Sequence, residues 1–457
     1  MKRLITTLLL ALSAAAASAQ APAPVPNTPY VKFAHAAWTR DATLYQINLR
    51  QFTAQGTIDA ARAQLPRLAR LGVGILWLMP VHPIGEAKRK GSLGSPYAVR
   101  DYRAVNPEFG TLADLRAFVD DAHKLGMHVI LDWVGNHTSW DSVLMKEHPE
   151  WYVRDGQGRP RPTPWYDWDD IIDLDYNQPG LRRYMADAMA WWVRDVGIDG
   201  FRADAAGLVP LDFWDTVGAE LRAIKPVFML AEWESRDLHA RAFDATYAWT
   251  WWDTLEAIAH GKKDATALYP YYAWNERFYP REAYRMVYTT NHDKNAWDGT
   301  EFEAFGPAVE AAAVFSFVGS GMPMLYNGQE AGNRKRLAFF ERDPIVWQDS
   351  PWNDIYRRLI ALKKSTPALW NGADGGVMRQ VRNSDDKRLF SFVREQGASK
   401  VFAVFNLSGT AVDARFKDEA QLGAWRDFGD GKAVSVDAGT VFRMAPWSWR
   451  VLVRDGR

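Results

Sequence analysis

Residues 197–206 read Gly197-Ile198-Asp199-Gly200-Phe201-Arg202-Ala203-Asp204-Ala205-Ala206. Phe201 to Asp204 has the pattern of a short buried strand. Side chains on a strand alternate between its two faces, so Arg202 and Asp204 are expected on the same face. A guanidinium within about 4–6 Å favours the ionised form of a carboxylate. We therefore expect Asp204 to be an anion at neutral pH and a candidate nucleophile, although ordinary buried ion pairs have the same pattern.

Short β-rich runs alternate with amphipathic helical runs from Thr43 to Trp370, which is typical of a parallel sheet covered by helices. The candidate strands are Leu44–Asn48, Ile75–Met79, His128–Trp133, Phe201–Asp204, Val227–Ala231, Thr246–Trp249, Met286–Thr289 and Met324–Tyr326. The predicted helices between them include Ile58–Leu71, Leu112–Leu125, Leu181–Val196, Leu211–Ile224 and Ala308–Val318. The pattern predicts an α/β fold, a (β/α)8 TIM barrel.

Two departures from a bare barrel are expected. Residues 138–177, rich in Trp, Pro, Asp and Gly, are too many for an ordinary loop and predict a short excursion domain over strand 3. After Trp370 the helical alternation stops, and residues 371–457 predict a C-terminal antiparallel β-sandwich. The barrel would then comprise residues 30–137 and 178–370.

The amino-terminal residues predict an exported protein. Lys2 and Arg3 precede an apolar run, and Ala17-Ser18-Ala19 follows it. This is the pattern of a signal peptide, residues 1–19, and the apolar run is too short for a membrane span. We expect cleavage after Ala19, a Pro- and Ala-rich leader at residues 20–29, and a periplasmic or secreted mature protein.

Composition limits the classes of partner. Lys plus Arg and Asp plus Glu each number 55, so there is no basic excess that would favour nucleic acid as the partner. The chain has no Cys, which excludes disulfides and thiolate metal sites. It has 22 Trp, 17 Tyr and 22 Phe, and some of these flat apolar faces suit the C–H-rich faces of sugars.

Polar residues follow several predicted strands, at the end where barrel enzymes place their active sites. Asp204, Glu232 and Asp293 are three carboxylates at such ends. Cleaving a glycosidic bond needs one carboxylate at the anomeric carbon and one carboxylic acid at the leaving oxygen. The three side chains are therefore expected to meet at one glycosidase site.

Four segments extend this pattern: Asp132-Trp133-Val134-Gly135-Asn136-His137, Gly200-Phe201-Arg202-Ala203-Asp204-Ala205-Ala206, Ala231-Glu232-Trp233 and Thr290-Asn291-His292-Asp293. Together, in this order, they resemble the four conserved regions of the α-amylase family, glycoside hydrolase family 13. The resemblance implies a retaining hydrolase of α-1,4-linked glucans such as maltodextrin or starch.

The resemblance also implies a role for each residue. Asp204 is expected to be the nucleophile, Glu232 the general acid and base, and Asp293 the carboxylate that binds sugar hydroxyls. The substrate-binding residues implied are Tyr97, Asp132, His137, Arg202 and His292. Tyr97 is the expected stacking platform, and Asp132 is expected to anchor Arg202. A retaining enzyme should hold its two reacting carboxyl groups about 5–5.5 Å apart.

The chain also departs from the family. Gly207 and Leu208 stand where many members have Lys and His, so leaving-group binding should differ. Asn136 matches a family ligand for structural calcium, which would need an acidic partner such as Asp169, Asp170 or Asp173. Calcium is an open alternative at this stage, and the chemistry itself requires no cofactor. A glucanotransferase, a sugar-isomerising relative and a non-catalytic glucan-binding protein are the rival functions.

Overall fold

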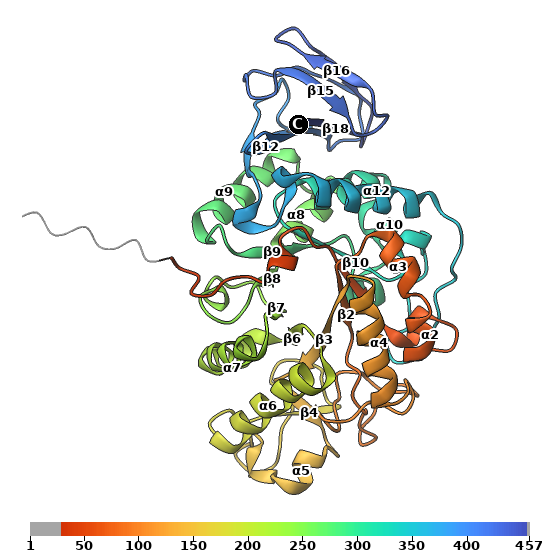
Figure 1. Ribbon diagram of the computed structural model, residues 1–457, viewed down its shortest axis with the longest axis vertical. Helices are drawn as coiled ribbons and strands as arrows, with labels where there is room; N and C mark the ends of the chain where they lie inside the picture. The colour runs from red at the N-terminus through yellow and green to blue at the C-terminus, as the bar shows by residue number, and fades with distance from the viewer. Residues whose placement is uncertain (1–28, 455–457) are drawn as a thin grey trace, which may run out of the picture. The chain divides into compact units, whose positions relative to one another are not determined.

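Eight parallel strands close into a barrel in the computed structural model, which describes residues 29–454 (Figure 1). Around the barrel these are β1 (Leu44–Ile47), β2 (Ile75–Leu78), β3 (His128–Val134), β6 (Gly200–Asp204), β7 (Phe228–Ala231), β8 (Ala245–Tyr247), β9 (Tyr284–Val287) and β10 (Met322–Tyr326), and β10 pairs with β1. The predicted TIM barrel is confirmed. The predicted signal peptide and residues 20–28 of the leader lie outside the described residues.

Four barrel strands begin earlier than predicted. The residues Gly200, Ala245, Tyr284 and Met322 open β6, β8, β9 and β10, whereas the sequence placed these starts at Phe201, Thr246, Met286 and Met324. Trp249, predicted to end a strand, begins helix α8 (Trp249–Ala259) instead. The short apolar runs in this region do not distinguish the last strand residue from the first buried turn of a helix.

Helices follow the barrel strands: α1 (Leu49–Phe52), α2 (Ile58–Arg62), α3 (Leu65–Leu71), α4 (Leu112–Lys124), α6 (Pro179–Trp191), α7 (Leu211–Ile224), α8, α9 (Leu268–Phe278), α10 (Glu301–Phe305), α11 (Val309–Val318) and α12 (Pro351–Ser365). The single helix predicted over residues 58–71 is two helices. Pro66 lies in the first turn of α3, and proline lacks the N–H that a continuous helix would use there. Within residues 29–454, no helix combines the length and hydropathy that crossing a membrane requires.

Glycine at position 200 allows β6 and β7 to approach closely. Gly200 has φ 141°, and a Cβ built there would lie 1.9 Å from the backbone oxygen of Phe228. No L side chain fits this backbone. Gly200 is therefore required for β6, which ends at Asp204, to pair with β7, which Glu232 directly follows.

The predicted excursion over strand 3 forms a small subdomain. Strand β4 (His137–Ser139) pairs antiparallel with β5 (Ile171–Asp173), and α5 (Val143–Glu147) lies between them in sequence. His137 is thereby fixed where the excursion leaves the barrel. This places excursion residues beside the carboxyl end of β3.

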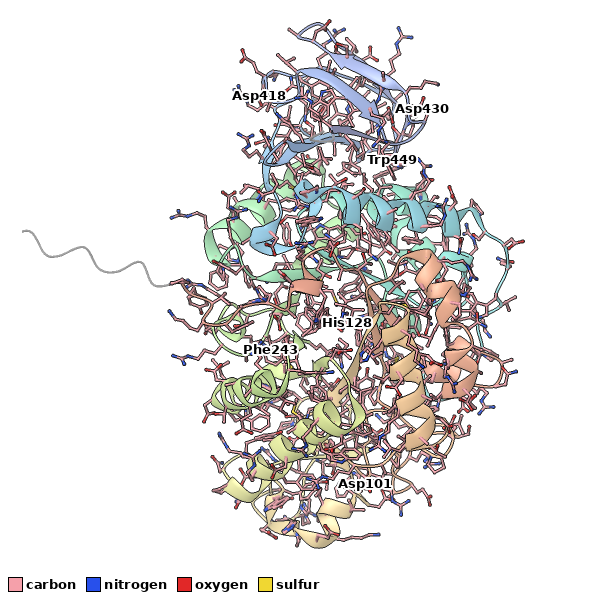
Figure 2. The ribbon with its side chains drawn as sticks, in the orientation of Figure 1. Asp101, His128, Phe243, Asp418, Asp430 and Trp449 are labelled. Atoms are coloured by element: carbon pink, nitrogen blue, oxygen red, sulfur yellow. The ribbon has the colours of Figure 1, made fainter. Side chains whose placement is uncertain are left out.

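The C-terminal region is a β-sandwich, as predicted. Its six-stranded sheet has the order β11 (Val377–Gln380), β12 (Leu389–Gln396), β13 (Ser399–Asn406), β18 (Trp449–Arg454), β15 (Gly423–Asp427) and β16 (Ala433–Val436), and β14 (Val412–Ala414) pairs with β17 (Phe442–Met444). An apolar cluster that includes Phe402, Trp425 and Phe442 fills the space between the sheets. Trp449, labelled in Figure 2, donates a hydrogen bond from Nε1 to Glu310 of α11 at 3.0 Å, which links the sandwich to the barrel helices.

Candidate active site

One cavity of about 640 Å³ lies at the carboxyl ends of the barrel strands. Asp204 ends β6, Glu232 directly follows β7, and Asp293 lies in the loop after β9. All three carboxylates line the cavity, as do Tyr97, His137 and His292. The structure thus brings together the three predicted catalytic residues and three of the predicted substrate-binding residues.

Arg202 lies beneath the cavity and contacts three carboxylates. Its Nη1 is 2.7 Å from Asp132 Oδ1 and 2.9 Å from Asp204 Oδ1, and its Nη2 is 2.7 Å from Glu232 Oε1. Arg202 and Asp132 have no exposed surface. They were predicted among the substrate-binding residues, but in the structure they act below the cavity, on the carboxylates.

Burial separates the pKa values of the two central carboxyl groups. It raises the pKa of Glu232 to about 8, against the opposing effect of Arg202 and with further increases from Asp204 and Asp293. Burial also raises the pKa of Asp204, to about 6, although Arg202 lowers it. Arg202 thus favours the ionised form of Asp204, as predicted, but burial has the larger effect on the pKa, which the sequence did not indicate. At neutral pH, Asp204 is ionised and Glu232 is protonated.

The backbone turns sharply directly after Asp204. Ala205 has φ 42° and ψ 42°, a left-handed conformation that is uncommon for a residue with a Cβ. In this conformation the Ala205 N–H donates to Glu232 Oε2 at 2.8 Å. The strained residue thus orients Glu232 relative to the neighbouring strand end, as strained residues at active sites often do.

Tyr97 and His292 form a parallel pair on the cavity wall. Their ring centroids are 5.5 Å apart with an interplanar angle of 21°. The Gln46 amide donates to His292 Nδ1 at 2.7 Å, which leaves the proton on Nε2 to donate to the Tyr97 hydroxyl at 2.8 Å, and that hydroxyl donates to Asp132 at 3.0 Å. The chain of bonds fixes both rings. Sequence reasoning missed Gln46, whose only signal is its place near the end of the first strand.

Burial lowers the pKa of His137 to about 4 and of His292 to about 4, so both imidazoles are neutral at pH 7. Each side chain is therefore a neutral hydrogen-bonding group in the cavity. The other lining residues are Lys90, Ser95, Asp167, Trp168, Asp170, Ile171, Trp297, Phe339 and Phe340. Sequence reasoning considered Asp170 only as a calcium candidate and gave no role to Ser95, Asp167, Ile171, Trp297, Phe339 and Phe340.

Gly207 explains one departure from the family pattern. A Cβ at this position would lie 2.1 Å from Cε2 of Trp233, so the indole ring occupies the space that a side chain would need. The surface beside Glu232 is therefore apolar and aromatic. A lysine in place of Gly207 would displace Trp233.

The surroundings of Asn136 do not fit calcium. Its Nδ2 donates to Asp173 Oδ1 and to Thr163, each at 3.2 Å, and the Thr163 hydroxyl also donates to Asp173. The other two acidic candidates, Asp169 and Asp170, face the Lys90 ammonium at 3.2 and 3.7 Å. Calcium needs a converging set of free oxygen ligands. Here Asp173 Oδ1 already accepts two hydrogen bonds, and Asp169 and Asp170 pair with a lysine.

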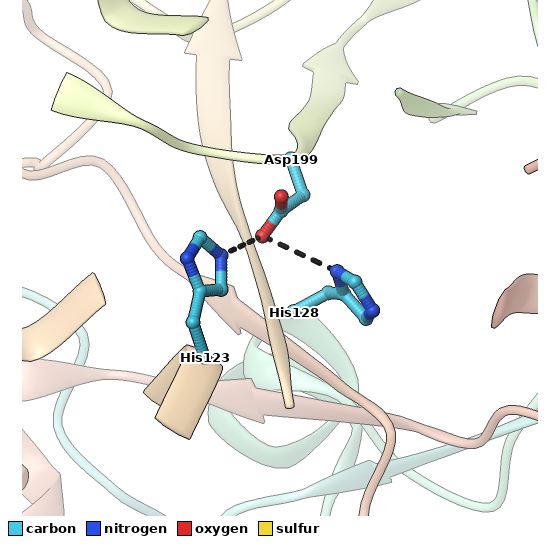
Figure 3. Close-up of side chains that lie close together, drawn as sticks. All are labelled: His123, His128 and Asp199. Carbon is cyan, nitrogen blue, oxygen red and sulfur yellow. Dashed lines mark hydrogen bonds and ion pairs between the residues drawn. The ribbon is translucent and has the colours of Figure 1, made fainter. Parts of the chain in front are cut away.

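A separate polar cluster lies at the opposite, amino end of the strands (Figure 3). Among the described residues, His123, His128 and Asp199 are the imidazole and carboxylate groups close enough to share a metal ion. His123 Nε2 is 2.7 Å from Asp199 Oδ2, and Lys225 Nζ is 2.9 Å from Oδ1. Because Lys225 already supplies a positive charge to the carboxylate, we interpret the cluster as an ion-pair network that joins α4, β3 and β6.

This network predicts a stability effect. The His and Lys partners hold the pKa of Asp199 well below its usual range, against burial. A depressed pKa contributes stability that is present above the unfolded-state pKa and lost as the pH falls. Asp199→Asn should lower the free energy of unfolding by about 2 kcal/mol at pH 7, less than for a fully buried pair.

Urea unfolding at pH 7 and pH 3 measures this effect. The difference between wild type and variant should shrink at the lower pH. Asp187→Asn is the matched control, because its partner Arg183 and Asp187 itself are both about half exposed, and such pairs contribute little. Equal losses in the two variants would contradict the assigned role of Asp199.

Comparison with known proteins adds independent information. Residues 39–222 match the family model described as alpha amylase, catalytic domain. The chain is 29% identical over 433 residues to the alpha-amylase MalA of Haloarcula japonica, covering 89% of this chain and 62% of that protein. It is 30% identical over 436 residues to an alpha-1,4-glucan:maltose-1-phosphate maltosyltransferase of Pseudomonas aeruginosa, covering 87% and 62%. The chain thus spans about three-fifths of the length of these curated relatives.

Among solved structures, a noncanonic maltogenic alpha-amylase, AmyB from Thermotoga neapolitana, matches with a TM-score of 0.83 and 28% identity. The match covers 91% of this chain and 99% of that one. An alpha-amylase from Lactobacillus plantarum matches with a TM-score of 0.81, also at 28% identity, over 91% and 99% of the two chains. The resemblance therefore includes the C-terminal sandwich as well as the barrel.

Proposed function

We propose that the chain belongs to the α-amylase family and is a retaining glycoside hydrolase that cleaves α-1,4-glucosidic bonds in maltodextrin or starch-like glucans. The observation that supports the proposal is geometric: Asp204 and Glu232 contact the same guanidinium at the mouth of the barrel. Burial raises the pKa of Glu232, to about 8, more than that of Asp204, to about 6. Such a pair supplies one anion and one acid at the same pH.

The reaction proceeds in two displacements. In the first, Asp204 attacks the anomeric carbon, the glycosidic C–O bond breaks, and the Glu232 proton goes to the leaving oxygen. In the second, Glu232 takes a proton from water, the water oxygen attacks the same carbon, and the bond to Asp204 breaks. Arg202 balances the negative charge on Asp204 before and after the covalent intermediate.

The other cavity residues bind the reacting sugar. Asp293, whose side chain is 42% exposed, accepts hydrogen bonds from sugar hydroxyls. Tyr97 offers a ring face that His292 holds in place, and the neutral imidazoles of His137 and His292 exchange hydrogen bonds with hydroxyls. On the leaving-group side, the Trp233 ring over Gly207 stacks on a sugar, in place of a charged contact.

The test of the proposal is the anomeric form of the first product. Maltoheptaose is incubated with the enzyme and followed by NMR and by a reducing-end assay. A retaining hydrolase releases the α-anomer first and increases the number of reducing ends. Products longer than maltoheptaose without a net increase would indicate the glucanotransferase alternative, and binding without any cleavage would indicate a non-catalytic protein.

The two pKa values predict a bell-shaped dependence of kcat/KM on pH. Activity requires ionised Asp204, so it should rise as the pH increases through about 6. It also requires protonated Glu232, so it should fall as the pH increases through about 8. Initial rates on maltoheptaose, measured from pH 4 to pH 10 at intervals of about one pH unit, define the rising and the falling parts of this profile. A flat profile between about pH 5 and 9 would contradict the assignment.

We also propose that the protein is exported, on the signal-peptide pattern of residues 1–19. Polymeric or oligomeric glucan outside the cytoplasm is then its substrate. Fractionation of cells that express the full chain, with amino-terminal sequencing of the mature protein, tests this location and the expected cleavage after Ala19.

A further inference from the structure

Two loops beside the cavity are held by neighbouring residues of α1. Arg50 donates from Nη1 to Gly94 O at 2.7 Å and from Nη2 to Leu93 O at 2.8 Å. Gln51 donates to Ala338 O at 2.7 Å and accepts from the Asp343 N–H at 2.7 Å. Arg50 is 1% exposed and Gln51 is fully buried. Both loops, residues 88–95 and 337–343, are thus hydrogen-bonded to α1, which follows the carboxyl end of β1.

The same loops contact each other. The Leu93 N–H donates to Phe340 O at 3.3 Å, and the Ser92 N–H donates to Glu341 Oε1 at 2.7 Å. Gly91 leaves room for this contact, because a Cβ there would lie 2.5 Å from Cβ of Phe340. The loop after β2 and the loop after β10 therefore form one continuous surface above β1.

Lys90 extends this surface to the excursion. Its Nζ lies 3.2 Å from Asp169 Oδ1 and 3.7 Å from Asp170 Oδ1, and it lines the cavity beside Trp168. On the other side, Trp297 from the loop after β9 packs on Phe339 with centroids 5.4 Å apart. We name residues 90–95, 167–170 and 337–343 together the β1-side wall.

The β1-side wall stands opposite the acid. In the closed order of eight strands, β1 lies four strands from β7 in either direction, and Glu232 directly follows β7. The general acid protonates the leaving oxygen, so the leaving part of the glucan lies on the Glu232 side of the reacting sugar. On the opposite side of the reacting sugar, the glucan continues toward its non-reducing end and there meets the β1-side wall.

We propose that the β1-side wall blocks passage of a long glucan chain, so that the enzyme acts at non-reducing chain ends and releases short saccharides of uniform size. This inference rests on the proposed function. The cavity volume of about 640 Å³ is in keeping with it, because it lies within the range of about 300–1,000 Å³ that is usual for sites of small-molecule ligands. Arg50 and Gln51 are positioning residues in this arrangement.

The test uses maltoheptaose and the same oligosaccharide with a 4,6-O-ethylidene cap on its non-reducing-end glucose. Wild type should cleave the free-ended substrate and act on the capped one about tenfold or more slowly, a discrimination of the size that a steric misfit gives. β-Cyclodextrin, which has no chain end, should resist cleavage similarly. The free-ended substrate should give one short product from the first time points.

A variant of the wall supplies the second readout. Lys90→Met keeps an unbranched side chain one atom shorter than lysine and removes the ion pairs to Asp169 and Asp170, so the ratio of capped to free cleavage should rise several-fold. Lys88→Met is the matched control in the same loop, because Lys88 Nζ lies over the Trp140 ring and does not line the cavity. Its ratio should equal that of wild type.

The possible failures are distinct. Equal rates of wild type on capped and free substrates would overturn the chain-end proposal and leave the hydrolase proposal standing. No cleavage of either substrate would overturn the proposed function and, with it, this inference. An unchanged ratio in Lys90→Met would show that Lys90 does not close the wall.

Discussion

Asp204→Asn should abolish release of reducing ends from maltodextrin. The substitution keeps the size of the side chain but removes the nucleophilic oxygen anion, so no covalent intermediate forms. The loss should exceed the roughly 10²–10⁴-fold that one acid–base group contributes, because Asp204 makes and breaks the bond to carbon. Initial rates from a reducing-end assay measure it, and a wild-type rate in the variant would refute the mechanism.

A second variant distinguishes loss of chemistry from loss of folding. Asp204→Ala opens space beside the anomeric carbon for a small anion. With α-glucosyl fluoride and added azide, this variant should regain turnover and form the β-glucosyl azide, because azide attacks from the side that the carboxylate occupied. Asp212→Asn is the control, since this exposed carboxylate pairs with Arg182 outside the cavity. It should retain the wild-type rate.

Glu232→Gln should affect substrates according to their leaving groups. A glucan must be protonated as it leaves, so the rate on maltodextrin should fall by about 10²–10⁴-fold. Fluoride leaves without protonation, so glycosyl–enzyme formation from α-glucosyl fluoride should be nearly unaffected. Pre-steady-state release of fluoride measures this first step separately from hydrolysis.

Glu234 provides the comparison for this experiment. It lies two residues along the chain, but it pairs with Arg285 and accepts hydrogen bonds from Thr250 at 3.0 and 2.8 Å. Glu234→Gln should therefore change the rates on the two substrates by the same factor. If Glu234→Gln instead reproduced the leaving-group dependence, Glu232 would lose its role as the acid.

Much of the fold was predictable because local patterns specify it. Alternating strands and helices indicated the barrel, and α7 has the predicted bounds, Leu211–Ile224. The three carboxylates were found because parallel barrel strands present their carboxyl ends at one mouth. The division of residues 58–71 into two helices was missed, although Pro66 is a visible signal for it.

The relations between distant segments could not be read from the sequence. Arg202 lowers the pKa of Asp204, as expected, but the sequence did not show that three carboxylates share Arg202 or that burial raises this pKa by more. Lys90 lines the cavity, where it faces Asp169 and Asp170, which lie far from it in the chain. The pKa of Asp204 and the position of Lys90 both depend on which groups surround each charge and on how far that charge remains exposed to water. No local sequence pattern encodes these properties.

The sequence alone determined the architecture and the residue types at the strand ends, because strand alternation and helical periodicity are local properties of the chain. The tertiary structure decided how Arg202 is shared among three carboxylates, how Trp233 packs over Gly207, and how residues 88–95 meet residues 337–343. These features arise where segments far apart in the chain meet, and their energies depend on burial and distance rather than on residue order.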